Sequence, residues 1–509
     1  MKTTGVLLVI IILFLPKIIF AQDGVLDTTF GTDGKVLTTF GYESDVQSLA
    51  LQPDGKIIAA GDVFNHGDFH QFGIARYHRD GSLDTTFGVD GRVVSDFLEY
   101  RISLNAVLVQ KDGKIIVGGL MSQDPSLLPS HSFLVRYTCN GTIDSDFGIG
   151  GKVIIGGIGF SSLALQSDGS IIAAGYSYTY FKNDFVLLKY EENGILDDDF
   201  GINGVVTTSI GENDFGHDVA LQSDGKIVLL GGYQNNFAIA RYDNDGILDP
   251  AFGSHGIVVL DIDFSPNSVK IQSDGKIVCA SMMSKLVRLL SNGDLDTGFG
   301  IEGIVQSPVS VSMEGGSDSI AIQNDGKIIV GGSYIDNVND TRCIALVRYQ
   351  INGDMDTTFG IDGLAETVFG QSSRSMLNCV LLQPDDKIVV GGESGPAFFG
   401  RHPNSVVLRY DLGTALTLSE FNNQKNRFSA YPNPVGSTVN LDCKLDQQEL
   451  FSVNLFDCNG KMIANLLKEA YFKTGYNSQK LELPETLAKG IYFLNISNGQ
   501  NSLNVKIVK

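Results

Sequence analysis

Short apolar runs, rich in β-branched residues and separated by glycine, asparagine and aspartate, recur from residue 26 to residue 410. In the first stretch of the chain, such runs fall at residues 35–40, 46–52, 56–61 and 72–77. Runs of this kind between turn residues are typical of β-strands. No long helical pattern interrupts them. The pattern therefore predicts an all-β structure built from groups of four short strands.

The third run of each group is apolar at consecutive positions, as in Ile57-Ile58-Ala59-Ala60 and Ile227-Val228-Leu229-Leu230. A strand with one solvated face would alternate apolar and polar residues, so these runs indicate strands covered on both faces. Sheets sandwiched between neighbouring sheets have this cover, whereas a flat open sheet does not. Several of these runs end in a glycine pair such as Gly118-Gly119, which favours the close approach of another backbone.

The groups belong to a repeat that occurs seven times. Each copy contains a segment resembling Leu-Asp-x-x-Phe-Gly, then Gln-x-Asp-Gly-Lys-Ile, and usually Arg-Tyr. The phenylalanines of the seven segments are spaced by 47 to 60 residues and are Phe30, Phe87, Phe147, Phe200, Phe252, Phe299 and Phe359. Four strands in each copy of such a repeat predict a seven-bladed β-propeller of four-stranded antiparallel blades.

The Leu-Asp-x-x-Phe-Gly segment lies between the last strand of one group and the first strand of the next. We expect its leucine and phenylalanine to pack between adjacent blades, because burying such a side chain stabilises a fold by about 1.5–3 kcal/mol. The repeats begin with a segment of this kind at residues 26–31. This first segment is therefore expected to pack against the seventh blade and to help close the ring.

An Asp-Gly pair such as Asp54-Gly55 separates the second and third runs of the first six copies. Asp-Gly between apolar runs is a strong hairpin signal, since glycine permits the positive φ that the turn requires. The seventh copy has Asp385-Asp386 instead. We expect that hairpin to be slightly strained or differently shaped.

The N-terminus has a different pattern. Lys2 precedes a nearly continuous apolar run at residues 6–20, and Ala21-Gln22 follows as a plausible cleavage point. This order is typical of a secretory signal peptide. A single membrane anchor is the alternative, although the run is short for a spanning helix, which needs about 20 apolar residues.

The net charge of −21 argues against nucleic acid as a partner, because phosphate binding requires a concentrated basic surface. The six cysteines form no Cys-x-x-Cys pair, so they do not indicate a zinc or thioredoxin-like site. Cys443 and Cys458 share the C-terminal region, where a disulfide between them is an open alternative to two separate thiols.

Two stretches could bind a metal. Residues 243–249 resemble the start of a calcium loop, but they lack the terminal glutamate, so a structural turn is the alternative. His66 and His70 are four residues apart, but they flank a loop and have no glutamate between them as a zinc helix would. No cofactor is expected. Neither a complete phosphate loop nor a nucleophile elbow is present, and we therefore expect the protein not to be an enzyme.

Deviations from the repeat are better indicators of function. Long connections occur at residues 121–132, 176–184, 333–342 and 393–404, always after the third run of a copy. We expect them to emerge on one face of the ring, where insertions often form a binding surface. Tolerated surface loops are the alternative. The aromatic candidates for contacts with sugar or protein are Tyr176, Tyr178, Tyr180, Phe181, Phe398 and Phe399.

The repeat closely resembles the delta-60 repeat family, whose hallmark is Leu-Asp-x-x-Phe-Gly followed by Gln-Pro-Asp-Gly-Lys-Ile and a Gly-Gly strand end. The resemblance covers residues 24–411. The fifth copy departs most, with Cys279-Ala280-Ser281 in place of the glycine pair and Arg288-Leu289 in place of Arg-Tyr. The resemblance implies a propeller-like, extracytoplasmic repeat protein without a defined activity, and it supplies no catalytic residues.

The chain changes character after Tyr410. A polar stretch at residues 411–427 precedes short alternating runs that predict a small β-sandwich. The motif residues in this region are Tyr431, Pro432, Asn433, Pro434, Gly490, Ile491 and Tyr492. The region is similar to the type A C-terminal sorting domain of the type IX secretion system. That family implies a Bacteroidota-like exported protein, carried across the outer membrane by a domain that is typically cleaved off.

The sequence thus predicts a signal peptide at residues 1–21, a propeller at 22–410, a linker at 411–427 and a sorting β-sandwich at 428–509. We expect a protein that is secreted or held at the outer cell surface after passing the periplasm, with no transmembrane segment once mature. Its expected partners are the type IX machinery and a glycan, protein or envelope ligand. A polysaccharide-degrading propeller and a purely structural surface or adhesion protein are the alternatives.

Overall fold

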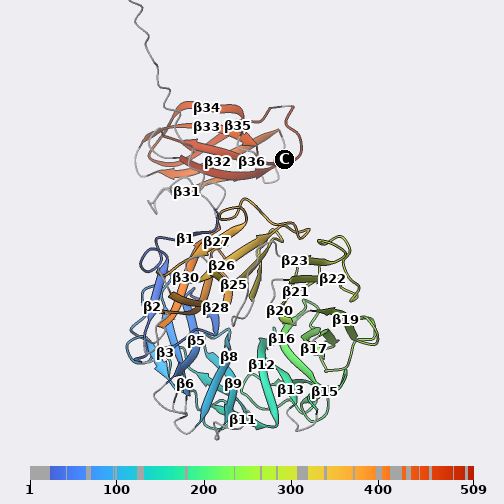
Figure 1. The fold of residues 1–509 in the computed structure, drawn as a ribbon. Helices are drawn as coiled ribbons and strands as arrows, with labels where there is room; N and C mark the ends of the chain where they lie inside the picture. Colours follow the sequence, from blue (N-terminus) through green and yellow to red (C-terminus); the bar gives the residue numbers. More distant parts are fainter. Residues whose placement is uncertain are drawn as a thin grey trace, which may run out of the picture. The chain divides into compact units, whose positions relative to one another are not determined.

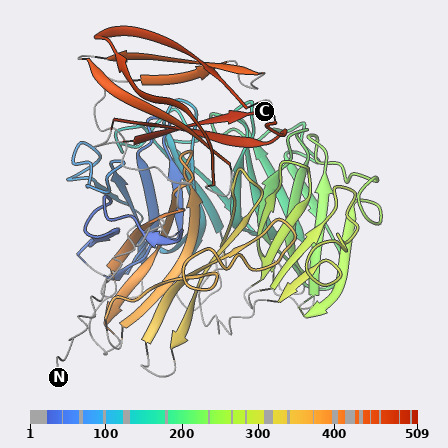
Figure 2. The ribbon, with the colours of Figure 1, turned by 90° about the horizontal axis from the view of Figure 1, so that it is seen from above.

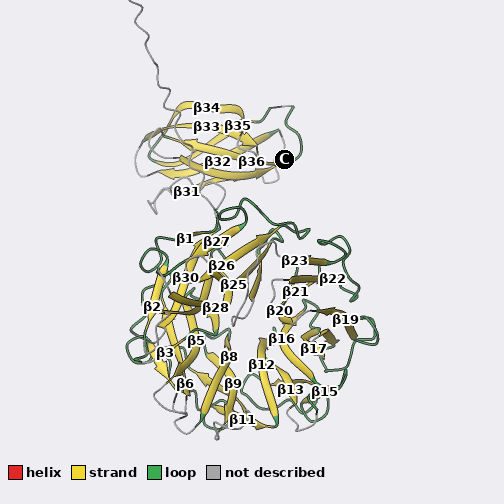
Figure 3. Ribbon diagram, viewed as in Figure 1, coloured by secondary structure: helices red, strands yellow, loops and turns green. Residues whose placement is uncertain are grey.

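The computed structural model describes residues 23–41, 43–64, 70–95, 97, 100–122, 131–177, 182–233, 236–263, 266–281, 285–306, 319–336, 341–370, 373–396, 404–412, 427–431, 437–445, 448–457, 461–484, 486–498 and 502–509. These residues form strands and loops without a helix (Figure 3). No helix that could cross a membrane therefore occurs in this part of the chain. The chain divides into two compact units, and the repeats occupy the unit that ends at Leu412.

The repeat unit contains seven antiparallel sheets arranged around a ring (Figure 1). From the centre outwards, the first blade consists of β4 (Ser48–Leu51), β5 (Ile57–Phe64), β6 (His70–Tyr77) and β7 (Arg92–Val94), and the second of β8 (Arg101–Val109), β9 (Ile115–Ser122), β10 (His131–Tyr137) and β11 (Lys152–Gly156). The third blade consists of β12 (Ile158–Leu165), β13 (Ile171–Ser177), β14 (Phe185–Tyr190) and β15 (Val205–Thr208). The fourth consists of β16 (Asp214–Leu221), β17 (Ile227–Tyr233), β18 (Asn236–Tyr242) and β19 (Ile257–Asp263). The short strand β3 (Glu43–Ser44) also pairs with β5.

Blades 5 to 7 repeat this order. Their strands are β20 (Pro266–Ile271), β21 (Ile277–Ser281), β22 (Lys285–Leu289) and β23 (Ile304–Gln306); β24 (Ser319–Ile322), β25 (Ile328–Asp336), β26 (Thr341–Tyr349) and β27 (Leu364–Thr367); and β28 (Ser373–Leu382), β29 (Ile388–Pro396) and β30 (Asn404–Asp411), followed by β2 (Lys35–Thr38) and β1 (Val25–Leu26). The first strand of each sheet lies nearest the centre of the ring, and seen from the side the strands run between its two faces (Figure 2). The predicted all-β propeller with seven blades is confirmed.

The boundary between blades differs from the one expected from the repeat. The run after each Leu-Asp-x-x-Phe-Gly segment was expected to be the first strand of its own group. Instead it is the outermost strand of the preceding blade, as β7 pairs with β6 and β11 pairs with β10. After Arg-Tyr, the chain turns back and runs antiparallel to the strand that ends in this motif. The strand that follows the Leu-Asp-x-x-Phe-Gly segment therefore forms its hydrogen bonds with that strand and becomes the outer edge of the same blade.

This offset explains how the ring closes. The seventh blade has no following repeat, so its outer strand comes from the N-terminus. Strand β2 pairs with β30, matching Lys35 to Leu408, and β1 matches Leu26 to Tyr410. Phe30 packs in one cluster with Val389 and Val407 of the seventh blade and with Ile57 of the first. The expectation that residues 26–31 pack against the seventh blade is confirmed.

The seven segment phenylalanines are almost inaccessible to water, with 1% or less of each side chain exposed. Phe87 packs with Ile74 of the first blade and Ile115 of the second. Phe147 packs in the same way with Leu134 of the second blade and Leu163 of the third. The phenylalanines therefore fill the spaces between adjacent blades, as expected from the sequence.

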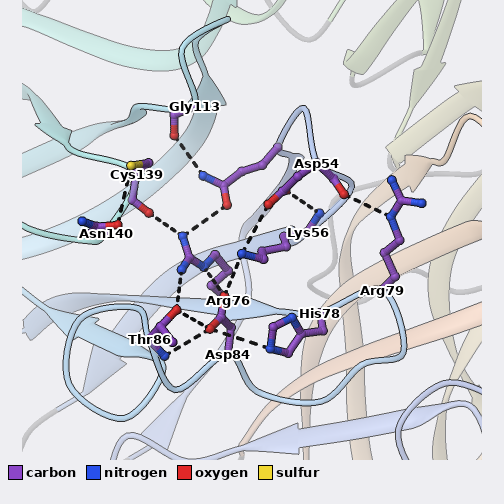
Figure 4. Close-up of polar contacts among 11 residues, drawn as sticks. Asp54, Lys56, Arg76, His78, Arg79, Asp84, Thr86, Gly113, Cys139 and Asn140 are labelled. Carbon is purple, nitrogen blue, oxygen red and sulfur yellow. Dashed lines mark hydrogen bonds and ion pairs between the residues drawn. The ribbon is translucent and has the colours of Figure 1, made fainter.

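The remaining motif residues form polar clusters, and Figure 4 shows the cluster of the first blade. In the first blade, Arg76 Nε lies 2.9 Å from Asp84 Oδ2, and Lys56 Nζ lies 3.2 Å from the same carboxylate. The guanidinium of Arg76 also stacks over the Phe87 ring at 4.7 Å and donates to the carbonyl oxygen of Cys139 in the second blade. The arginine therefore joins the segment, its own blade and the next blade through charge-assisted hydrogen bonds.

The same arrangement recurs around the ring. An arginine or lysine stacks on the phenylalanine of all seven segments, in the pairs Arg76–Phe87, Arg136–Phe147, Lys189–Phe200, Arg241–Phe252, Arg288–Phe299, Arg348–Phe359 and Arg409–Phe30. Arg409 pairs with Asp27, and Arg348 pairs with Asp23 at 2.5 Å. The N-terminal residues thus complete the clusters of the last two blades.

The turn in the seventh copy has the conformation expected to cause strain. Asp386 has a φ of 63°, in the left-handed region that glycine occupies in the other copies, such as Gly55 with a φ of 83°. A side chain in that region costs free energy that glycine avoids.

The second unit contains two sheets. The first consists of β31 (Arg427–Tyr431), β32 (Thr438–Leu445) and β35 (Gly475–Glu482), and the second of β34 (Met462–Phe472), β33 (Glu449–Asp457), β36 (Ile491–Ser497) and β37 (Ser502–Val508). Their inward side chains, including Leu441, Val453 and Leu494, share one buried core. This is the two-sheet arrangement predicted for the C-terminal region.

Candidate functional site

The innermost strands carry a β-bulge at equivalent places. The pairing of β8 with β9 shifts between Leu104 and Ala106, which leaves Asn105 as the extra residue. Equivalent shifts leave Ser161, His217, Asn267 and Asn378 as the extra residues of the third, fourth, fifth and seventh blades. A bulge bends its strand and redirects the extra side chain. Gln47 holds the equivalent position of the first blade, next to Ser48.

In several blades a glycine within the second strand lies opposite the bulge. A Cβ atom on Gly119 would lie 2.1 Å from the carbonyl oxygen of Ser103, and one on Gly175 would lie 1.8 Å from that of Gly159. These carbonyls belong to the bulged inner strands. The glycines predicted to mark a close backbone approach therefore do so beside these bulges, because a side chain there would collide with the inner strand. The fifth blade has Ser281 at this position.

The bulge residues line an open channel at the centre of the ring. Its cavity has a volume of about 460 Å³, and all seven innermost strands contribute to its wall. The six described bulge positions are occupied by Gln47, Asn105, Ser161, His217, Asn267 and Asn378. The side chains change from blade to blade here, whereas the motif residues of the polar clusters recur.

Hydrogen bonds between inner strands hold the wall of the channel. The backbone N–H of Val107 donates to Ser48 Oγ at 3.1 Å, and that of Val380 donates to Ser319 Oγ at 3.1 Å. In the fourth blade Asp218 replaces the serine and accepts from the Val269 N–H at 2.8 Å and from Ser162 Oγ at 2.7 Å. Each bond joins two neighbouring blades, so the channel is built on a rigid frame.

His217 is the aromatic side chain of the lining. Its imidazole is accessible to water inside the channel. The surrounding inner strands displace part of the water around His217 and so lower its pKa, and the nearby Asp218 carboxylate acts in the opposite direction. Because the pKa of His217 is lowered from the usual value of histidine, the imidazole is neutral at pH 7 and offers one donor and one acceptor.

Carboxylates gather beside the channel where the first and seventh blades meet. Burial, together with the charges of Asp45 and Glu43, raises the pKa of Glu393 to about 7 against the opposite effect of Arg342. Burial also raises the pKa of Asp45 to about 6. Asp45 Oδ1 accepts from the backbone N–H of Asp62 at 2.8 Å. Among the residues that the structure describes, no group of three His, Cys, Asp or Glu side chains could hold a metal ion.

The two stretches considered for metal binding have other contacts. Asp243 Oδ1 accepts hydrogen bonds from the backbone of Asp245 and Ile247, which forms a turn. The ring of His70 contacts Phe64 at 4.8 Å, and His66 lies outside the described residues. The calcium and zinc alternatives therefore gain no support from these side chains.

Of the aromatic candidates, Tyr176 packs edge-on against Phe215 at 5.1 Å, between the third and fourth blades. Tyr178, Tyr180, Phe181, Phe398 and Phe399 lie outside the described residues. The four long connections all follow the second strand and precede the third strand of their blades, and residues 123–130, 178–181, 337–340 and 397–403 within them lie outside the described residues. The aromatic contacts proposed for them stay a prediction.

The motif residues of the C-terminal unit have structural roles where they are described. Tyr492 is buried, and its hydroxyl donates to the carbonyl oxygen of Ala488 at 3.1 Å. Gly490 pairs with Lys509 at the end of the chain, Ile491 begins β36, and Tyr431 ends β31. Pro432, Asn433 and Pro434, like Ala21 and Gln22, lie outside the described residues.

Cys443 lies in the buried core of the second unit, and Cys458 lies outside the described residues. A disulfide between the two stays a prediction.

Sequence reasoning did not identify the channel residues. They were detectable, because each lies five positions before the glutamine of its Gln-x-Asp-Gly turn, as Asn105 precedes Gln110 and His217 precedes Gln222. A variable polar residue within an otherwise apolar run was the available signal. That these positions face a shared axis depends on the bulge and the closed ring, neither of which the pattern specifies.

Comparisons with known families match both units. A family model described as "Domain of unknown function (DUF5122) beta-propeller" matches residues 52–87, 110–147, 166–200, 222–252, 272–299 and 323–359. A model described as "Secretion system C-terminal sorting domain" matches residues 429–509. Each propeller match runs from the glutamine of the turn to the segment phenylalanine. The seventh such unit is divided between the two ends of the propeller and is not among the matches.

No curated protein matches the chain significantly. Among solved structures, it is similar to "YCF48 bound to D1 peptide" with a TM-score of 0.41 and 10% identity, covering 77% of this chain and 97% of the other. It is also similar to apo prolyl oligopeptidase B from Galerina marginata, with a TM-score of 0.40, 11% identity and coverage of 79% and 56%. A third similar structure is acylaminoacyl peptidase from Pyrococcus horikoshii, with a TM-score of 0.37 and 10% identity, covering 79% of this chain and 57% of the other.

Proposed function

Because this chain is a DUF5122-type, delta-60-like propeller repeat protein with a type IX C-terminal sorting domain, we propose that it is an exported binding protein. The sorting domain indicates secretion or export to the cell surface. In this proposal the propeller holds a glycan, protein or envelope ligand and does not alter it chemically.

One observation carries the proposal, namely the open polar channel at the centre of the ring. In a repeat protein, positions that serve the scaffold recur, whereas positions that meet a ligand can differ among repeats. The arginine and phenylalanine positions recur in the clusters, but the bulge positions present amides, a hydroxyl and an imidazole. Pockets of this volume are typical of small-ligand sites in proteins.

The test is to incubate the purified exported protein with a panel of envelope and plant glycans and with peptides. Binding is measured by titration calorimetry, and the recovered ligand is analysed by mass spectrometry. We expect saturable binding of at least one ligand, recovered intact. A variant with serine in place of Ile202, whose side chain is 80% exposed on the rim, serves as the control and should bind normally.

Two results would contradict the proposal. Shortened oligosaccharides after incubation would favour the polysaccharide-degrading enzyme. Failure of every glycan and peptide to bind saturably would favour a structural surface protein.

A further inference from the structure

The polar atoms that face the channel indicate which ligand chemistry fits it. Three neighbouring blades present a carboxamide at the bulge, namely Asn378 of the seventh blade, Gln47 of the first and Asn105 of the second. Asn105 Nδ2 donates to the carbonyl oxygen of Phe160 at 2.5 Å, and Asn378 Nδ2 donates to that of Val46 at 3.1 Å. A carbonyl can only accept, so the amide nitrogen must point towards it. Gln47 Nε2 donates to Asp45 Oδ2 at 2.8 Å.

In each of the three carboxamides, the nitrogen donates a hydrogen bond to another group of the protein. The carbonyl oxygen remains available to a ligand in the channel. None of these three oxygens accepts a hydrogen bond from another described residue. One side of the channel therefore presents hydrogen-bond acceptors. A ligand group that contacts these carbonyl oxygens must donate.

The other side presents a hydroxyl, an imidazole and a further carboxamide, Asn267 of the fifth blade. Ser161 lines the channel in the third blade, and the neutral imidazole of His217 lines it in the fourth. Elsewhere in the wall, the hydroxyls of Ser48 in the first blade and Ser319 in the sixth accept backbone N–H groups through oxygen, which leaves their protons for another acceptor. A ligand must therefore both donate and accept.

The formal charges in the lining neutralise each other. Lys270 Nζ lies 3.6 Å from Asp218 Oδ2. Lys270 also donates to the carbonyl oxygen of Val269 at 3.1 Å, while Asp218 accepts from backbone and serine groups. The pair therefore adds no net charge to the channel. Burying an unpaired charge is costly, so an anionic or cationic group is disfavoured here.

Apolar side chains complete the wall, including Leu49, Leu163 and Val219. They can contact the C–H groups of a ligand whose polar groups are satisfied by the carboxamides, hydroxyls and imidazole.

We propose that the axial channel binds a neutral, hydroxyl-rich ligand, the end or an exposed residue of an uncharged saccharide. Hydroxyl groups donate to the carbonyl oxygens of Gln47, Asn105 and Asn378 and accept from Ser161 and His217. A carboxylate has no proton for the first side, and an ammonium group has no acceptor for the second. This inference rests on the proposed binding function and adds the place and the chemistry of the ligand.

The experiment titrates the full exported chain with neutral oligosaccharides of the maltose, cellulose, xylose and mannose series. Glucosamine trimer and galacturonic acid trimer serve as the cationic and anionic counterparts. We expect a neutral oligosaccharide to bind at least about tenfold more tightly than either charged trimer, the factor that one good hydrogen bond represents.

Two variants locate the site. Ser161→Phe adds volume to the channel without removing a described hydrogen bond, and it should weaken binding at least tenfold. His217→Ala removes a donor and an acceptor without adding volume, and it should weaken binding by about three- to tenfold. Thr207→Phe, on the outer strand of the same blade as Ser161, is the matched control and should bind like the wild type. Melting curves verify that each variant is folded.

The outcomes separate the two proposals. Wild-type affinity for a neutral oligosaccharide in both channel variants would overturn the channel as its site and leave the binding function standing. Equal or tighter binding of a charged trimer would overturn the neutral ligand class. Absence of binding to every oligosaccharide overturns this inference, and absence of binding to the glycans and peptides of the wider panel overturns the proposed function as well.

Discussion

At the scale of single residues, small departures from the repeat leave local defects. The tyrosine hydroxyl of the Arg-Tyr motif bonds to a threonine on the outer strand of the preceding blade, as Tyr242 does with Thr208 at 2.7 Å. For the tyrosine of the third blade, Tyr190, the equivalent of Thr208 on the outer strand of the preceding blade is Ile155. The buried hydroxyl of Tyr190 consequently has no hydrogen-bond partner among the described residues. A buried polar group without a partner lowers stability.

The substitution Tyr190→Phe should therefore raise the free energy of unfolding by about 1 kcal/mol, because it removes an unsatisfied buried hydroxyl. Tyr242→Phe, the matched control, should lower it by about 1 kcal/mol, since Thr208 loses its partner. Urea unfolding followed by fluorescence measures both. Equal effects of the two substitutions would show that Tyr190 is satisfied in solution.

Glu393 makes stability depend on pH in a defined direction. Its pKa is about 7 in the folded protein and 4.5 in the unfolded chain. Between these values the unfolded chain has lost the proton and the folded protein keeps it, so stability falls as pH rises. The expected slope is at most about 1.4 kcal/mol per pH unit. Glu393→Gln should flatten the decrease in melting temperature between pH 5 and pH 7. Unchanged pH dependence in the variant would assign the effect to other groups, such as Asp45.

At the scale of elements, the third blade lacks part of the polar cluster that joins its neighbours. Lys189 replaces the arginine and reaches Asp197 at 3.1 Å. In the next blade Arg241 also donates to Gln222 Oε1 and to the carbonyl oxygen of Ser291. The equivalent acceptor Gln166 Oε1 is buried and receives no hydrogen bond from the described residues. One ammonium group cannot replace the planar fork of a guanidinium.

Lys189→Arg should therefore stabilise the protein by roughly 1–2 kcal/mol, by supplying bonds to Gln166 and to the fourth blade. Arg241→Lys should destabilise it by a similar amount and is the reciprocal control. Thermal unfolding monitored by circular dichroism compares the two. If Lys189→Arg lowers the melting temperature, the space around Gln166 does not accept a guanidinium.

At the scale of the whole molecule, closure depends on residues from the two ends of the propeller. The N-terminal segment supplies the outer strand of the seventh blade, the carboxylates of Asp23 and Asp27, and the ring of Phe30. These residues contact the last two blades, although Asp23 and Asp27 lie more than 300 sequence positions from their partners Arg348 and Arg409. A ring closed in this way has no free edge strand between its first and last blades.

Deleting residues 23–38 should open this closure, since it leaves β30 without its outer partner and exposes the space filled by Phe30. We expect aggregation or loss of cooperative unfolding, measured by light scattering and calorimetry. A synthetic peptide of residues 23–38 should restore part of the stability by mass action. A soluble deletion product that melts like the wild type would rule out this role.

The C-terminal unit acts at the same scale through export. Deleting residues 431–509 should leave the protein in the periplasm, because the element that indicates passage across the outer membrane is lost. Cell fractionation with immunoblotting measures the distribution. Protease resistance of the trapped protein is the control for a folded propeller. Undiminished appearance at the surface or in the medium would contradict the assignment.

Local patterns in the sequence determined much of this protein. Apolar runs covered on both faces, Asp-Gly turns and seven spaced phenylalanines specified the strands, the blade number and the packing between blades, because these features depend on neighbouring residues. The C-terminal motifs likewise indicated a sorting domain.

Tertiary structure alone decided three further features. It assigned each outer strand to the preceding blade, since strand pairing depends on which edge is free when the chain returns. It joined Asp23 to Arg348 and Phe30 to the seventh blade through ring closure. It also turned Asn105, His217 and their equivalents towards one axis, because a bulge opposite a glycine redirects a side chain only when two backbones meet in space.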